Sequence, residues 1–143
     1  MYATLQPLHS YLAYLLLAVL VIAIIFNASA FMSGKKYSEA NRKWSLYGLI
    51  ATHIQFLLGL LLYFVSDLGM NNISKANMKD SDARLYFLEH PLMMLIAVVL
   101  ITIGYSKSKR IEASDKKFRT MLAFYGVGLI FILSRIPWSN WLN

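Results

Sequence analysis

Three histidines, one glutamate and one arginine interrupt otherwise apolar stretches of this sequence. They are His9, His53, Glu89, His90 and Arg135. Imidazole is a common protein ligand of transition metals, including the iron of haem. A carboxylate at the same depth as a guanidinium forms an ion pair, or carries a proton when burial raises its pKa. These residue types indicate a site for a metal or a proton within an apolar protein.

The apolar stretches themselves are long enough to cross a membrane. Of 143 residues, 58% are hydrophobic and only 15% are charged, and the mean hydropathy is +0.53. Soluble domains are nearer half apolar and a quarter charged. A membrane helix needs roughly 20 mostly apolar residues. The sequence therefore predicts an all-α integral membrane protein with one domain, 1–143, and four transmembrane helices near residues 8–32, 44–66, 85–106 and 120–138.

The basic residues predict how these helices are oriented. Ten of the 14 Lys and Arg lie in two segments, 35–43 and 107–119, which fall on the same side of a four-helix chain. Positively charged loops stay in the cytoplasm, so we expect both termini outside. The short connections favour an up-down bundle. The net charge of +7 is thus explained by topology, and no nucleic-acid partner is expected.

Other kinds of chemistry are excluded or disfavoured by what the sequence lacks. It has no cysteine, which excludes disulfides, thiolate metal sites, iron–sulfur clusters and thioether-linked haem. It also has no phosphate-binding loop, nucleophile elbow, H-E-x-x-H motif or paired carboxylates. Hydrolysis and phosphoryl transfer are therefore not expected, and the sequence leaves open whether the protein is an enzyme at all.

The histidines lie one on each of the first three predicted helices. Two imidazoles at compatible depth on facing helices can hold the iron of one haem b. His90 is the first candidate, because Pro91 has no N–H to bond to the Phe87 carbonyl and the helix can bend there. His53, near the midplane, is the second candidate, and His9 at the outer surface is an alternate ligand.

Two alternatives stay open for these side chains. His53 and His90 differ in depth by about 10 Å, so either tilt brings them together or His9 pairs with His90. The histidines can also hydrogen-bond neighbouring helices without any metal, and three of them allow one bis-histidine haem at most. Glu89 and Arg135 are expected to pair between the third and fourth helices or to handle a proton, with Gln55 as a neutral polar companion.

Four segments carry a resemblance to a known family. They are "LHSYLAY", "THIQFLLGLLLYF", "EHPLMMLIAVVLITIGYSKSKR" and "IPW". The chain resembles, over nearly its whole length, small bacterial four-helix membrane proteins labelled cytochrome b or cytochrome b-like. After His9 and Ser10, relatives often continue with Gly-Leu-Arg-Trp, whereas this chain has residues 11–14 as Tyr-Leu-Ala-Tyr. The arginine of that helix is therefore missing, and Arg135 is a candidate substitute.

The resemblance implies a haem b protein of respiratory electron transfer in the bacterial inner (cytoplasmic) membrane. Together with the histidines, it predicts electron transfer by one haem b, with quinol as a possible donor. The alternative is a non-catalytic accessory subunit of a larger respiratory or transport complex. Expected partners are the lipid bilayer, other membrane subunits or further copies of the chain.

Overall fold

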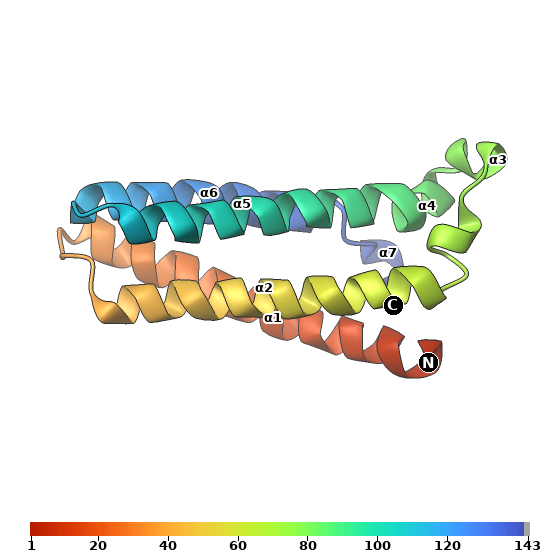
Figure 1. Cartoon of the computed structure of the whole chain (residues 1–143), viewed down its shortest axis with the longest axis horizontal. Helices are drawn as coiled ribbons and strands as arrows, with labels where there is room; N and C mark the ends of the chain where they lie inside the picture. The colour runs from red at the N-terminus through yellow and green to blue at the C-terminus, as the bar shows by residue number, and fades with distance from the viewer. Residues whose placement is uncertain (142–143) are drawn as a thin grey trace.

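Four long helices run alternately up and down the structure, a computed structural model that describes residues 1–141 (Figure 1). They are α1 (Tyr2–Met32), α2 (Glu39–Val65), α5 (His90–Arg110) and α6 (Ser114–Ser134). The all-α prediction with four long apolar helices is confirmed. The last two residues of the predicted domain, 1–143, lie outside the described residues.

Short elements join these helices. The connection between α2 and α5 contains η1 (Met70–Asn72), α3 (Lys75–Met78), α4 (Ser81–Arg84) and the π-helical turn η2 (Leu85–Glu89), and the chain continues after α6 into α7 (Trp138–Trp141). With α4 and η2 joined to α5, each of the four helical rods is long and apolar enough to span a membrane. This is the architecture of a multi-pass membrane protein.

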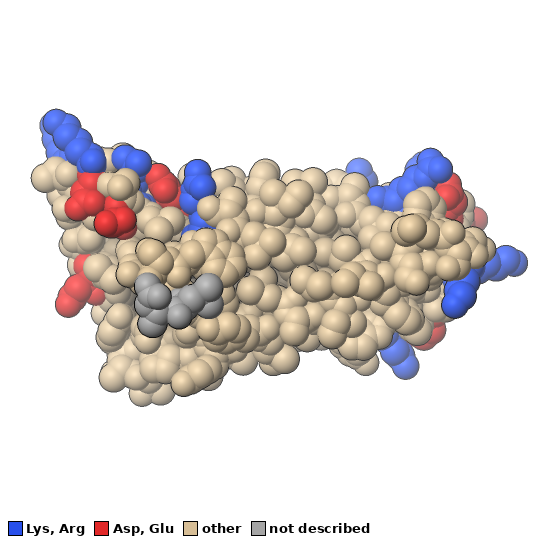
Figure 2. All heavy atoms as spheres, turned by 180° about the vertical axis from the view of Figure 1, so that it is seen from behind, with Lys and Arg blue, Asp and Glu red and all other residues tan. Residues whose placement is uncertain are grey.

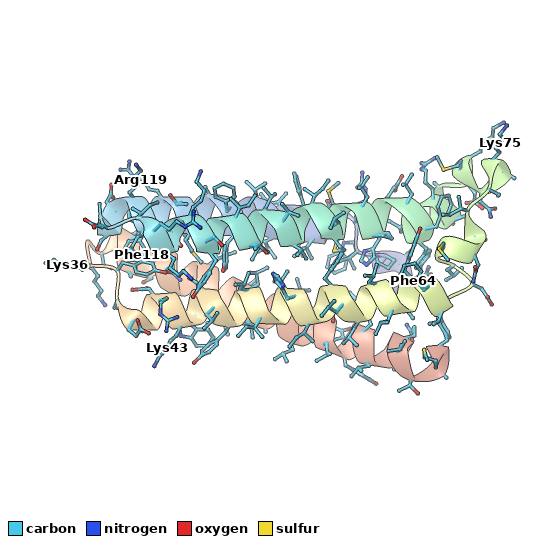
Figure 3. All side chains as sticks on the ribbon, in the orientation of Figure 1. Lys36, Lys43, Phe64, Lys75, Phe118 and Arg119 are labelled. Carbon is cyan, nitrogen blue, oxygen red and sulfur yellow. The ribbon has the colours of Figure 1, made fainter. Side chains whose placement is uncertain are left out.

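The two ends of the bundle differ in chain content and charge. The loop end holds the tight connections 33–38 and 111–113, and the terminal end holds the N-terminus, the 66–80 connection and α7 (Figure 1). Ten of the 14 Lys and Arg and three of the seven Asp and Glu lie at or beside the loop end. Figure 3 marks Lys36, Lys43 and Arg119 there. In Figure 2 the charged atoms gather at the two ends and leave the middle of that face uncharged.

Helix α2 is polar on its buried side. Its buried residues recur every three or four positions along one face. They form what we call the polar stripe: Asn41, Ser45, Gly48, Thr52 and Gln55. The exposed side of the same helix is apolar, with Ile50, Ile54 and Leu57 among its exposed residues. In a membrane helix this is the favourable arrangement, because polar groups that face lipid find no hydrogen-bond partners.

The stripe is held by hydrogen bonds within and between helices. The Ser45 and Thr52 hydroxyls donate to backbone carbonyls four residues earlier, at 2.9 and 2.7 Å. The fully buried Tyr125 of α6 crosses the bundle and donates its hydroxyl proton to the Ser45 carbonyl at 2.7 Å. Gly48 leaves room for this ring, since a Cβ there would lie 3.4 Å from both Tyr125 Cε2 and Leu20 Cδ1.

Small residues also bring α5 and α6 into close contact. A Cβ added at Gly104 would lie 2.5 Å from Phe124 Cβ, and one at Gly128 would lie 2.8 Å from Ile101 Cγ1. Real Cβ atoms do not approach other atoms this closely, so these two glycines set the distance between the helices. Close approach at small residues is the usual way for membrane helices to pack.

Toward the terminal end, α1 diverges from α5 and α6, and α7 lies in the intervening space (Figure 1). Trp141 ties α7 to α1: its Nε1 donates to Ser10 Oγ at 2.7 Å, and its ring stacks on Tyr14 with centroids 4.4 Å apart. The chain segment after α6 thus folds back over the part of α1 that carries His9.

Candidate functional site

His90 follows a turn in which the helix widens. Pro91 has no N–H to donate, so the carbonyl of Phe87 is left without its helical partner. The backbone widens into the π turn, where the N–H of His90 bonds to the carbonyl of Leu85. Tyr63 of α2 donates its hydroxyl proton to the Phe87 carbonyl at 3.0 Å. The irregularity predicted from Pro91 is a π turn, of the kind often found at functional sites.

The tautomer of His90 is set by the end of α6. Helix α6 stops before Pro137, so the carbonyl of Arg135 has no helical donor. His90 Nδ1 lies 2.8 Å from this oxygen. A carbonyl can only accept, so Nδ1 carries the proton, and the neutral ring has its free lone pair on Nε2. Within the described residues Nε2 makes no hydrogen bond, and this is the state in which imidazole binds a metal.

His9 lies beside His90. The ring centroids are 6.3 Å apart with an interplanar angle of 87°. His9 packs on Gly59 of α2, where an added Cβ would lie 2.9 Å from His9 Cε1. Its backbone carbonyl accepts a hydrogen bond from Gln55 Nε2 at 2.7 Å. Four helices thus meet at the His9–His90 pair.

Among the residues that the structure describes, four buried side-chain atoms have no hydrogen-bond partner. Two of them, His9 Nδ1 and Gln55 Oε1, lie at this pair. Unpaired buried polar atoms are costly and uncommon in folded proteins. Their presence beside the free Nε2 of His90 identifies this place as the best candidate for a ligand.

His53 does not join the pair. It is exposed on the side of α2, where its Nε2 lies 2.8 Å from Thr102 Oγ1 of α5. Gly59, which contacts His9, is six residues farther along α2, or about 9 Å. Of the two pairings weighed from the sequence, the structure brings His9 and His90 together and leaves His53 apart.

Glu89 lies between two guanidinium groups. Arg135 Nε is 3.7 Å from Glu89 Oε1, as expected from the sequence, but Arg84 Nε is closer, at 2.7 Å from Oε2. In an α-helix, residues five apart do not face each other. The π turn places Arg84 over Glu89, so this pair depends on a backbone feature that the sequence analysis did not predict.

We expect Arg84→Ala to lower the free energy of unfolding by about 0.5–1 kcal/mol more than Arg135→Ala, because Glu89 keeps its shorter ion pair when Arg135 is removed. The difference is small because the side chains of Arg84, Glu89 and Arg135 are partly exposed. Unfolding in mixed detergent micelles gives the free energy of unfolding of both variants. When the two substitutions are made in a Glu89→Gln protein, the difference between them should vanish. A larger loss for Arg135→Ala would show that the pair between the third and fourth helices dominates.

The site lacks the ligands for a bare metal ion. Over the described part of the chain, no group of three or more His, Cys, Asp or Glu is placed to hold one. The fold and the site define a class, the multi-pass helical membrane bundle with a half-buried histidine pair. Compared with known proteins, the chain matches no family model, no curated protein and no solved structure.

Proposed function

We propose that this chain holds one haem b between His9 and His90 and takes part in electron transfer in the bacterial inner membrane. The observation that carries the proposal is the half-buried His9–His90 pair, in which His90 has a fixed Nδ1–H donor and a free Nε2. Haem contributes reversible one-electron oxidation and reduction of its iron.

The spacing of the two rings suits a shared iron. An imidazole nitrogen binds a transition metal at about 2 Å, so two rings whose centres lie about 6 Å apart could share one iron. The centroids of His9 and His90 are 6.3 Å apart. This agreement favours the alternate pair over the pair of His53 with His90.

The number of ligands favours haem over a bare ion. A metal held by protein side chains alone usually needs three or four of them, and only two imidazoles meet here. Haem would supply four nitrogen ligands from its own ring and would need only one or two ligands from the protein. The donor set therefore fits haem better than zinc or copper.

Neighbouring groups of the chain keep the ligands in place. The Arg135 carbonyl holds the His90 ring in one orientation, and Gln55 fixes the backbone of His9. Gly59 leaves room for the His9 ring. Glu89, next to His90 in the sequence, is held between Arg84 and Arg135. We further propose that the basic loop end faces the cytoplasm and that both termini lie outside.

The visible absorption spectrum tests this proposal. Protein expressed with ample haem is expected to show the sharp α and Soret bands of a low-spin b-type haem. His9→Ala and His90→Ala should each lose the low-spin bands, and His53→Ala should keep them, because His53 lies outside the pair. Each variant is compared at equal folded concentration, judged by gel filtration in detergent.

Two results would contradict the proposal. Loss of the bands in His53→Ala with retention in His9→Ala would restore the other pairing. Absence of the bands from folded protein supplied with haem would contradict electron transfer by haem. It would favour the accessory subunit. Isolation of the chain in a larger complex is expected for both the haem protein and the accessory subunit. It indicates the accessory subunit only if the haem bands are also absent.

A further inference from the structure

The hydrogen bonds of His53 fix its tautomer. The Thr102 hydroxyl lies 2.7 Å from the carbonyl of Val98, which can only accept, so the hydroxyl proton points there. The lone pair of the Thr102 hydroxyl must then accept from His53, whose Nε2 is 2.8 Å away. His53 therefore carries its proton on Nε2, and Nδ1 of the neutral ring is a free hydrogen-bond acceptor.

This acceptor is exposed at a depth where acceptors are rare. His53 lies near the middle of the 27-residue α2, on its outward side. Its Nδ1 has no partner among the described residues. Polar side chains in a membrane normally face the bundle interior, because lipid offers them nothing to bond. The polar stripe of α2 follows this rule, and His53 is the exception on the same helix.

A second copy of the chain that packs through the same face would not supply the missing donor. Copies related by an axis along the membrane normal meet at equal depth. Within four residues of His53 and Thr102, the other exposed side chains of α2 and α5 are all apolar: Ile50, Ile54, Leu57, Val99 and Ile103. Phospholipid headgroups are also too far away, since they lie about 15 Å from the centre of a bilayer.

We propose that His53 is a binding site for a membrane-soluble hydroquinone, whose phenolic O–H donates to Nδ1. A hydroquinone ring is apolar enough to enter the hydrocarbon region and carries the hydrogen-bond donor that the site lacks. The apolar side chains around His53 would contact its ring. A hydroquinone bound here would be the electron donor of the proposed function, so this role rests on that function, but the binding itself requires no haem.

The site distinguishes the two oxidation states of its ligand. A quinone has only carbonyl oxygens and offers Nδ1 no proton, whereas the hydroquinone offers one. The extra hydrogen bond should make the hydroquinone bind about fivefold more tightly than the quinone. The two forms also differ in polarity, so the preference is measured relative to His53→Phe, which keeps the apolar surface and lacks the acceptor.

The experiment titrates haem-free protein in phosphatidylcholine nanodiscs with duroquinol and, separately, with duroquinone under anaerobic conditions. Nitrogen NMR of protein labelled at histidine follows the binding. We expect an Nε2–H tautomer for His53 before titration and a shift of its Nδ1 resonance with duroquinol. His53→Phe should abolish the fivefold preference, and His53→Gln, whose amide can donate to Thr102 and accept from the ligand, should keep part of it.

Three control variants make the test specific. Ile54→Ala alters the same exposed face without changing any hydrogen bond, so it should lower both affinities equally. Thr102→Val frees the tautomer of His53 and should reduce the preference. His9→Phe removes a proposed haem ligand and should leave duroquinol binding unchanged, which separates a failure of this site from a failure of haem binding.

Equal affinity for duroquinol and duroquinone, or a preference that persists in His53→Phe, would overturn the proposal. An Nδ1–H tautomer of His53 would overturn it as well. Efficient disulfide cross-linking of two His53→Cys chains in the membrane would show that a second copy covers this face, and would also count against a hydroquinone site.

Discussion

Gly104→Val is expected to lower the free energy of unfolding by about 3 kcal/mol, near the upper end of what overpacking costs. A Cβ at this position would lie 2.5 Å from Phe124 Cβ and 3.2 Å from Phe124 Cγ. Phe124 Cβ is fixed to the backbone of α6, so it cannot rotate away. The two helices must therefore separate, and the packing of Ile101 on Gly128 one turn away is lost with them.

Gly126→Val is the matched control for this experiment. It places the same side chain on α6, where a Cβ at Gly126 meets nothing within 4 Å. Both variants change helix propensity by similar amounts, so their difference isolates the helix contact. Unfolding by sodium dodecyl sulfate in mixed micelles gives the free energies. Equal losses for the two variants would show that Gly104 does not set the distance between α5 and α6.

The second large effect is expected at Gly59. In Gly59→Val the new side chain occupies the place of the His9 ring, whose Cε1, Nδ1 and Nε2 all lie within 3.7 Å of the added Cβ. The ring is the free end of a side chain, so we expect the ring to move while α1 and α2 keep their positions. We expect haem to bind at least about tenfold more weakly, because a ligand displaced by 1 Å no longer meets the iron.

This variant has a readout that does not depend on haem. In haem-free protein, the nitrogen resonances of His9 should shift, while those of His53 should not, since His53 packs on α5. Gly126→Val should change neither the resonances nor the haem affinity. Unchanged His9 resonances in Gly59→Val would show that the contact between α1 and α2 is looser than the structure indicates.

The number and order of the helices could be predicted from the sequence, because hydropathy reports which segments lipid can accommodate. Their ends could not. Helix α1 begins at Tyr2 and α5 continues to Arg110, since residues outside the hydrocarbon region can remain helical. Hydropathy therefore gives the part of each helix that crosses the membrane, and the full helices are longer.

The position of His53 outside the His9–His90 pair can be predicted from the sequence. Depth along a helix does not give it, but direction around the helix does. The stripe spacing of Asn41, Ser45, Thr52 and Gln55 already marks the buried side of α2. His53 is two residues from Gln55, about 200° around the helix, and therefore points outward. A helical wheel of α2 would have favoured His9 as the partner of His90.

The ion pair between Arg84 and Glu89 could not have been predicted in the same way. It requires a π turn, and Pro91 alone does not determine whether a helix kinks, ends or widens. The wider turn is stabilised because Tyr63, 24 residues earlier on another helix, satisfies the Phe87 carbonyl. Such a contact depends on how the helices pack, which local sequence does not specify.

The polar stripe of α2 has a consequence for how the protein is made. As a single segment leaving the ribosome, α2 would satisfy its Ser45 and Thr52 hydroxyls within the helix but would present the Gln55 amide to acyl chains. Beside α1 this amide donates to the His9 carbonyl. The smallest unit that can enter the bilayer without exposing the Gln55 amide to lipid is therefore the helical hairpin of α1 and α2. The translocation machinery should retain α1 until α2 has emerged.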